Sequence, residues 1–225
     1  MPRRVRRLVL LRHGQTEWNA SSRMQGQIDT VLTELGRAQA VAAAEVLAKR
    51  QPLLIVSSDL RRAYDTAAAL GEQAGLPVEV DTRLRETHLG DWQGLDHHEV
   101  DVVAPGARLA WRDDARWAPH GGESRVDVAE RSLPLVTELV AREKQWGSEP
   151  EADRPVVLVA HGGLIAALTA ALLGIPVDNW PILGGMGNAS WVQLSGHSGF
   201  GARPQDVKWR LDVWNASAQV ANDVL

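Results

Sequence analysis

The sequence predicts an α/β fold in which a mostly parallel central sheet lies between two layers of helices. Short, uninterrupted apolar runs indicate strands that are buried on both faces. Segments of helical length follow most of these runs, and this alternation is typical of a three-layer α/β/α sandwich. The 225 residues show no internal repeat or break in composition, so we expect a single domain over residues 1–225.

The first half of the chain alternates strands and helices regularly. In chain order it predicts strands at residues 8–11, 53–56 and 78–80 and helices at 33–48 and 60–74. The strands are apolar runs bounded by polar or turn-forming residues. Thr33 is suited to the N-cap of the first helix, and Gly75 with Pro77 ends the second. A polar loop at 19–29 separates the first strand from the first helix.

The second half continues the pattern after residue 122. In chain order it predicts a helix from Ser124 to about Glu143, a strand at 156–160, a helix at 164–173 and strands at 190–194 and 207–214. Ser124 and Asp127 resemble a capping box at the start of the long helix. Residues 156–160 are the clearest buried strand of the sequence, because all five are apolar.

Residues 83–122 have an irregular pattern rich in Gly, Pro, His and Trp. We interpret residues 87–122, approximately, as a lid-like insertion over the site, with short helices near 96–103 and 107–111. Three of the nine tryptophans lie in it, namely Trp92, Trp111 and Trp117. Tryptophan faces stack on sugar rings, although packing is the commoner role. Its arginines Arg108, Arg112 and Arg116 are candidates for gripping a carboxylate, but such residues are more often solvated.

Composition excludes several classes of function. A net charge of −4 gives no reason to expect nucleic acid or an anionic membrane as a partner. The absence of cysteine excludes disulfides, thiolate metal sites and cysteine nucleophiles. No apolar stretch is long enough to span a bilayer, and the run at 8–11 is too short for a signal-peptide core. We therefore expect a cytoplasmic protein that acts on a small molecule.

Two histidines follow predicted strands in the same way. His13 follows the first strand and precedes Gly14, and His161 follows the strand at 156–160 and precedes Gly162. In parallel sheets the carboxyl ends of the strands meet at one crevice. A glycine after each histidine allows backbone N–H groups to approach a ligand closely. A single histidine of this kind is more often structural, but a pair with Arg12 beside it favours an anion site.

Two further charged residues follow strands and extend this pattern. Arg62 lies at the start of the helix after the second strand, where the helix N-terminus favours an anion. Glu86 follows the third strand, and the charge of a bound phosphate would favour the protonated carboxyl that a proton donor needs. Taken alone, each residue also fits a surface position, Arg62 solvated on its helix and Glu86 paired with Arg85.

The sequence resembles the histidine phosphatase superfamily, the phosphoglycerate mutase-like enzymes. The motif LRHGQTEWN at 11–19 matches the family signature, and further matches lie, in the same order, at 57–67, 84–94, 121–124 and 159–163. This resemblance implies the phosphoglycerate mutase-like fold and a phosphohistidine intermediate on His13. It also implies a phosphate clamp of Arg12, Arg62 and His161, with Glu86 as the acid.

The same resemblance implies a set of substrate contacts at Asn19, Gln25, Gly26 and Gly162. A neutral imidazole has one lone pair for attack on phosphorus, so the other ring nitrogen should donate to a backbone carbonyl, which we expect near Gly14. Two arginines supply the positive charge that magnesium supplies in other phosphoryl-transfer sites. We therefore expect neither a cofactor nor a metal.

Within the family, the residues after Glu86 favour a phosphatase. Mutases typically continue with a Tyr-Gly pair and then a lysine and two arginines, whereas this chain has THLG at 87–90 and no lysine between Lys49 and Lys144. The segments at 23–27, 104–112, 184–191 and 209–219 resemble a branch that acts on glucosyl-3-phosphoglycerate and releases glucosylglycerate. That resemblance implies a cytoplasmic homodimer. A broad-specificity phosphatase of sugar phosphates or phosphoglycerate and a cofactor-dependent mutase remain alternatives.

Two other classes of function are disfavoured. A non-enzymatic phosphate-binding scaffold on this fold would be expected to lose His13 or Glu86, and both are present. A metal hydrolase would have ligands at His97, His98, His120 or Glu123. Adjacent side chains diverge on a helix or strand, however, and the sequence contains no helical HExxH motif.

Overall fold

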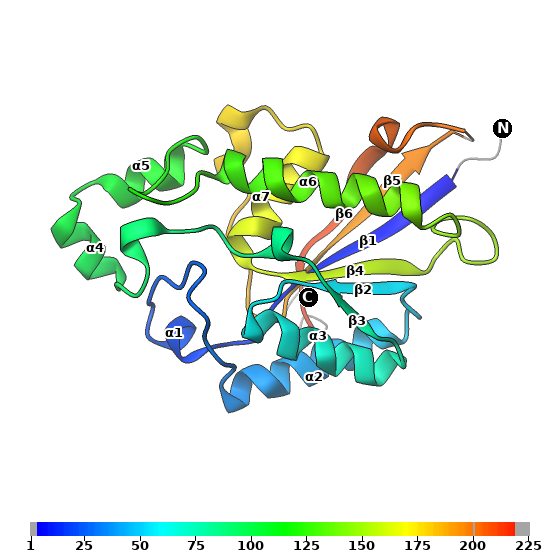
Figure 1. Cartoon of the computed structure of the whole chain (residues 1–225), viewed down its shortest axis with the longest axis horizontal. Helices are drawn as coiled ribbons and strands as arrows, with labels where there is room; N and C mark the ends of the chain where they lie inside the picture. The colour runs from blue at the N-terminus through cyan, green and yellow to red at the C-terminus, as the bar shows by residue number, and fades with distance from the viewer. Residues whose placement is uncertain (1–3, 200, 219–225) are drawn as a thin grey trace, which may run out of the picture.

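Six strands form one mixed sheet in the computed structural model, which describes residues 4–199 and 201–218 (Figure 1). The strands are β1 (Arg4–Arg12), β2 (Leu54–Ser57), β3 (Val78–Val80), β4 (Pro155–Ala160), β5 (Trp191–Ser198) and β6 (Lys208–Ala216). Their order is β3-β2-β4-β1-β5-β6. The first four in this order pair in parallel, whereas β5 and β6 are antiparallel to their neighbours.

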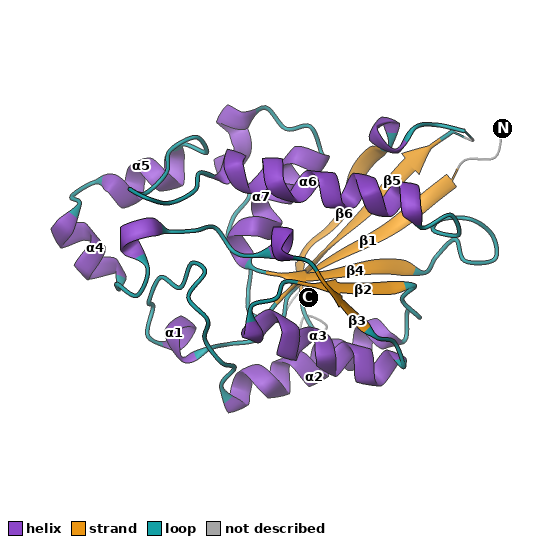
Figure 2. Cartoon of the chain, viewed as in Figure 1, coloured by secondary structure: helices purple, strands orange, loops and turns teal. Residues whose placement is uncertain are grey.

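Helices cover both faces of this sheet, and the predicted three-layer α/β/α sandwich is confirmed (Figure 2). The α-helices are α1 (Glu17–Ala20), α2 (Glu34–Ala48), α3 (Arg61–Ala74), α4 (His97–Val103), α5 (Ala107–Asp113), α6 (Arg125–Arg142) and α7 (Gly162–Leu172). Short 3₁₀ helices lie at η1 (Thr82–Leu84), η2 (Gly90–Trp92), η3 (Val177–Ile182) and η4 (Pro204–Asp206). Helices α6 and α7 lie on one face of the sheet and α2 and α3 on the other.

Alternation along the central strands builds the two halves of the core. In β1, Leu8 and Leu10 pack in the cluster formed with α6 and α7, whereas Val9 and Leu11 pack in the cluster formed with α2 and α3. All four side chains are buried, and so is every residue of β4. Side chains of a strand alternate between faces, so a strand covered by helices on both sides must be apolar throughout.

The predicted helix caps are present. Thr33 Oγ1 accepts the Gly36 N–H at 2.9 Å and caps α2. Ser124 Oγ accepts the Asp127 N–H at 3.1 Å, and the Asp127 side chain accepts the Ser124 N–H at 2.8 Å, which completes a capping box at α6. Gly75 ends α3 with φ +65°, a conformation that favours glycine.

Several element boundaries differ from the prediction. Strand β1 begins at Arg4 rather than residue 8, because its polar first half pairs with β5 and needs no apolar side chains there. Helix α7 begins at Gly162 rather than residue 164, directly after the strand-end histidine. The loop predicted at 19–29 starts inside the short helix α1, and helix α5 continues to Asp113.

Helices α4 and α5 lie at one end of the molecule, beyond the edge of the sheet (Figure 1). They have a small apolar cluster of their own, separate from the two main clusters. Its buried members are Met24, Leu89, Trp92 and Val100, with Leu95, Ala107, Trp111 and Trp117 packed against them. Within residues 4–199 and 201–218, no helix has the length and apolar character needed to cross a membrane.

Candidate active site

A pocket of about 150 Å³ opens where β1 ends, between the sheet and the segment that carries α4 and α5. It is lined by Arg12, His13, Asn19, Arg23, Gln25, Gly26, Arg62, Glu86, Thr87, Leu89, Trp111 and Gly163. Seven of the nine predicted site residues are in this lining, and they come from five separate stretches of the sequence. The fold therefore brings together side chains that the sequence predicted to meet.

His13 is held in one tautomer. Its Nδ1 lies 2.7 Å from the carbonyl oxygen of Gly14, and a carbonyl only accepts, so Nδ1 must carry the hydrogen. The other nitrogen, Nε2, then keeps its lone pair. The ring is only 3% exposed. Burial, reinforced by the charges of Arg12 and Arg62, lowers the pKa of His13 well below its usual value, so the imidazole is neutral.

His161 is not in the pocket lining; it is fully buried, with its ring centroid 5.1 Å from that of His13. Its Nε2 lies 3.0 Å from Ser58 Oγ, while its buried Nδ1 has no hydrogen-bond partner among the described residues. Burial, and then the charge of Arg62, lowers the pKa of His161 well below its usual value. A buried nitrogen without a partner costs free energy, so it marks a place where a polar ligand group fits.

Two arginines complete the floor of the pocket. Arg62 is fully buried, and its terminal nitrogens donate to the carbonyls of Gly26 at 2.8 Å and Ile28 at 2.9 Å. Arg12 donates to the carbonyl of Met186. The Nε atoms of both arginines are buried and have no hydrogen-bond partner within residues 4–199 and 201–218. Burial lowers the pKa of Arg62 to about 10, so it stays charged at neutral pH.

Glu86 lies against the N-terminus of α7. Its carboxylate accepts the N–H groups of Gly163 at 3.1 Å and Leu164 at 3.0 Å, together with that of Thr87 at 2.8 Å. Free N–H groups at a helix start lack partners within the helix, and here the Glu86 carboxylate supplies them. Glu86 therefore faces the same pocket as His13 while its position is fixed by the backbone of a second element.

Two side-chain amides present their nitrogens to the pocket. Asn19 Oδ1 accepts from the Thr16 N–H and from Asn188 Nδ2, both at 3.1 Å, which leaves its own Nδ2 available. Gln25 is buried, and its Oε1 accepts from Thr30 Oγ1 at 2.7 Å, which leaves its Nε2 available in the same way. Both amides are thus oriented as donors, the polarity that an anionic ligand requires.

The other predicted positions lie around the pocket. Gly162 packs behind Arg12, where a Cβ would come within 3.4 Å of Arg12 Nε, and its neighbour Gly163 lines the pocket instead. Of the three tryptophans in the insertion, Trp111 reaches the pocket, whereas Trp92 and Trp117 stack on each other with centroids 5.3 Å apart.

None of the three arginines predicted in the insertion lines the pocket. Arg108 pairs with Asp101 at 2.6 Å, and Arg116 pairs with Asp178 at 2.5 Å. Arg112 is exposed. Arg23, Thr87 and Leu89 also line the pocket, although no sequence pattern predicted a role for these side chains. Their signal was their nearness to Gln25 and Glu86 in the chain.

The described residues offer no alternative metal centre. Within residues 4–199 and 201–218, no group of three or more His, Asp or Glu side chains is arranged to hold a metal ion. His120 pairs with Asp91 at 2.8 Å on the surface, and Glu123 pairs with Arg131 at 2.8 Å. His97 and His98 are exposed on α4.

Comparison with known proteins agrees with this site. Residues 8–216 match the model of the histidine phosphatase superfamily, branch 1. The chain is 79% identical to a glucosyl-3-phosphoglycerate phosphatase of Mycolicibacterium vanbaalenii, over 99% of this chain and 100% of that protein. It is 76% identical to the protein of the same name from Mycobacterium tuberculosis strain H37Rv, again over 99% and 100%.

A solved structure of a mycobacterial glucosyl-3-phosphoglycerate phosphatase with inorganic phosphate superimposes with a TM-score of 0.89. It is 75% identical, and the match covers 95% of this chain and 99% of that one. The family match spans nearly the whole chain and includes the segments that line the pocket. The chain therefore belongs to the histidine phosphatase superfamily, and it is a phosphatase.

Proposed function

We propose that this enzyme hydrolyses glucosyl-3-phosphoglycerate to glucosylglycerate and inorganic phosphate, through a phosphohistidine on His13 and without a metal ion. The names of its full-length relatives support the substrate. One observation carries the mechanism: buried nitrogens of Arg12, Arg62 and His161 have no partner in the part of the chain that the structure describes, and these residues lie close to His13. Such a set of donors is complementary to a tetrahedral phosphate.

In the first step, His13 Nε2 attacks phosphorus in line with the leaving oxygen. A nitrogen–phosphorus bond forms as the oxygen–phosphorus bond breaks. The lone pair is available because Nδ1 donates to Gly14 and because the buried ring stays neutral. Arg12, Arg62 and His161 stabilise the charge on the three equatorial oxygens. A preorganised donor of this kind contributes about 3 kcal/mol to lowering the barrier.

Glu86 handles the proton in both steps. The negative charge of a bound phosphate favours the protonated carboxyl, which donates to the leaving oxygen. Once the alcohol has left, the carboxylate accepts a proton from water as the water attacks the phosphohistidine, and His13 is released. The N–H groups of Gly163 and Leu164 hold the Glu86 carboxyl group in position for both steps.

The outer part of the pocket fits the organic part of the substrate. A phosphoglycerate carries a carboxylate besides its phosphate, and it needs a cation beyond the two of the phosphate clamp. Arg23 supplies it at the rim, where its Nη1 donates to the Gly94 carbonyl at 2.7 Å and pairs with Glu99 at 3.3 Å, while its other nitrogens have no partner in the described chain. Trp111 and Leu89 give an apolar wall against which a sugar ring can pack.

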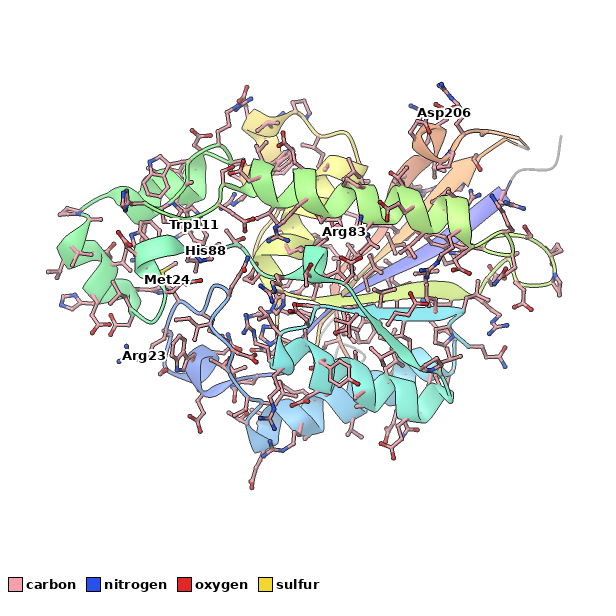
Figure 3. All side chains as sticks on the ribbon, in the orientation of Figure 1. Arg23, Met24, Arg83, His88, Trp111 and Asp206 are labelled. Carbon is pink, nitrogen blue, oxygen red and sulfur yellow. The ribbon has the colours of Figure 1, made fainter. Side chains whose placement is uncertain are left out.

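We propose the following roles for the rest of the site. Asn19 and Gln25 donate to the phosphate or the glycerate oxygens. Gly26 leaves room for Gln93 while its carbonyl holds Arg62, and Gly162 packs against Arg12. The insertion at about 87–122 acts as the lid of a single domain. Figure 3 shows Trp111 close to Met24 at the lid end of the molecule, where both belong to one apolar cluster.

Rapid-quench labelling tests the proposed mechanism. Substrate labelled in its phosphoryl group should leave an acid-labile, base-stable adduct on His13, and the variant His13→Ala should form none and release no phosphate. Activity should persist in excess chelator, because the arginines supply the charge. An adduct on another residue, or loss of activity that added metal restores, would contradict the mechanism.

A substrate panel tests specificity, and hydrodynamics tests assembly. Among glucosyl-3-phosphoglycerate, 3-phosphoglycerate and simple sugar phosphates, the first should give the highest kcat/KM; equal values would favour the broad-specificity alternative. We also propose a cytoplasmic homodimer, on the basis of the resemblance within the family. Light scattering should then give twice the chain mass of 24.5 kDa, and a monomer at micromolar concentration would contradict it.

A further inference from the structure

Arg131 makes an unusual set of contacts on the far side of the Glu86 loop. It lies in α6 and donates to three successive parts of the 83–86 backbone: the carbonyls of Arg83 at 2.7 Å, Arg85 at 2.9 Å and Glu86 at 2.9 Å. The carbonyls at the end of η1 and in the loop after it need partners, and here one guanidinium supplies them. Arg131 does not line the pocket.

Glu123 completes this arrangement. Its carboxylate accepts from Arg131 Nε at 2.8 Å and Nη2 at 3.0 Å, and also from the N–H of His88 at 2.8 Å. The backbone N–H of Glu123 donates in turn to the His88 carbonyl at 2.7 Å. The Arg131–Glu123 pair therefore spans the loop, holding its carbonyls before Glu86 and its peptide groups after it. Figure 3 labels Arg83 and His88, which lie at the two ends of this loop.

The pair is only partly exposed, with side-chain exposures of 22% for Arg131 and 23% for Glu123. Burial alone would raise the pKa of Glu123, but the hydrogen bond and charge of Arg131 outweigh it and the pKa is lowered, so both groups are charged. A half-buried pair with shared backbone contacts keeps its geometry better than a fully exposed ion pair, which contributes little.

We propose that Arg131 and Glu123 are positioning residues, which hold the Glu86 carboxylate at the distance from the leaving oxygen that proton transfer requires. The inference rests on the proposed role of Glu86. The carboxylate reaches the pocket from a backbone whose carbonyl is held by Arg131 on one side and by Gln27 Nε2, at 3.1 Å, on the other. Without the guanidinium, three carbonyls lose a partner together and the loop relaxes.

A general loss of structure would impair phosphate binding and proton transfer together, whereas loss of the Arg131–Glu123 pair should impair only proton transfer. Phosphate binding depends on Arg12, Arg62 and His161, none of which hydrogen-bonds to Arg131. Proton transfer depends on Glu86 alone. Loss of the pair should therefore reduce the rate for alkyl phosphates, whose leaving oxygen needs a proton, and spare aryl phosphates, whose leaving oxygen does not.

The experiment compares kcat/KM for a sugar phosphate and for p-nitrophenyl phosphate in Arg131→Met, Glu86→Gln and the double variant. This ratio covers the steps up to release of the alcohol, so it excludes the later hydrolysis of the phosphohistidine, in which Glu86 acts on both substrates alike. General acids contribute on the order of 10²–10⁴-fold, so Arg131→Met should lower kcat/KM for the sugar phosphate at least about 10-fold. It should lower kcat/KM for the aryl phosphate less than about 3-fold and leave inhibition by inorganic phosphate unchanged. In the Glu86→Gln background, Arg131→Met should then add less than about 2-fold, because both changes remove the same proton transfer.

Arg83→Met is the matched control. Arg83 lies just before the Glu86 loop and pairs with Asp81 and with Glu138, which belongs to α6 as Arg131 does. Its side chain makes no hydrogen bond to the backbone of Glu86. It should change neither substrate. Should Arg131→Met fail to fold, Arg131→Lys and Glu123→Gln keep most of the packing and should show the same leaving-group dependence in weaker form.

Each outcome decides the question. Equal losses on both substrates in Arg131→Met, or multiplicative losses in the double variant, would overturn the positioning role while leaving Glu86 intact as the acid. A Glu86→Gln variant that affects both substrates equally would instead overturn the proposed acid itself, and the positioning role with it. The leaving-group dependence of Glu86→Gln alone distinguishes these two failures.

Discussion

The two buried histidines make folding stability depend on pH in a way that the structure predicts. The pKa of both His13 and His161 is lowered well below the ordinary value, first by burial and then by neighbouring arginines. As the pH falls through about 6.5, the ordinary pKa of histidine, both rings become protonated in the unfolded chain but stay neutral in the folded chain. Their contribution to stability is fully present above about pH 6.5 and is lost as the pH falls below it.

The size of the effect follows from this linkage. If a ring stays neutral in the folded state, the unfolded state gains about 1.4 kcal/mol per histidine on going from about pH 7.5 to about pH 5.5. Two such rings give a ceiling of about 3 kcal/mol, a large part of the 5–15 kcal/mol, roughly, by which domains are stable. Bound inorganic phosphate should reverse much of the loss, because its negative charge offsets the arginines and favours protonated rings.

The assay is urea denaturation at both pH values in buffers without phosphate or sulfate. The double variant His13→Gln/His161→Gln should lose most of the difference that the wild type shows between the two pH values. The double variant His97→Gln/His98→Gln is the matched control, because both of its rings are exposed, and it should keep the wild-type difference. If both double variants keep the same pH dependence, the buried rings do not resist protonation and the reasoning is wrong.

Three further changes have defined outcomes. Arg23→Met should raise KM for glucosyl-3-phosphoglycerate about 10-fold or more, as expected for the loss of one charge-assisted hydrogen bond, and should affect p-nitrophenyl phosphate much less. Arg61→Met is the control, because Arg61 is exposed and pairs with Asp65. Equal effects of Arg23→Met on both substrates would refute carboxylate recognition. Leu158→Ala should lower the free energy of unfolding, measured by urea denaturation, by about 2–5 kcal/mol, because the side chain is fully buried on a strand that pairs with β1 and β2. A loss under about 1 kcal/mol would mean that the core collapses around the gap. Gly36→Ala should destabilise the fold and lower kcat together, because the added Cβ would overlap the backbone of Gln15, two residues from His13. An unchanged kcat in a folded variant would show that the backbone at Gln15 shifts without moving the His13 ring.

The sequence predicted most of the fold because local patterns determine it. Uninterrupted apolar runs located β1, β2 and β4, and shorter or alternating patterns indicated β3, β5 and β6. Cap residues such as Thr33 and Ser124 located helix starts. The hydrogen bond from His13 Nδ1 to Gly14 was also predictable, because donor and acceptor are neighbours in the chain. Helix α1 was missed because four residues show no period.

Features that depend on distant contacts could not be read from the sequence. Arg131 contacts a carbonyl 48 residues away, and nothing near it in the chain distinguishes it from a solvated helix arginine. Trp111 reaches the pocket while Trp92 and Trp117 pack together, although all three lie in one irregular stretch. Which tryptophan meets the substrate depends on how two short helices cross, and periodicity carries no information about that.

The separate apolar cluster around Trp92 allows part of the pocket wall to be changed without disturbing the main core. The residues proposed to handle phosphorus are fixed to the sheet and to α3 and α7, whereas Leu89 and Trp111 belong to a cluster that the main core does not share. Replacing those two side chains repacks a small peripheral unit and leaves the reaction centre in place. A library at these two positions is therefore a direct route to enzymes that release phosphate from other esters at an unchanged chemical centre.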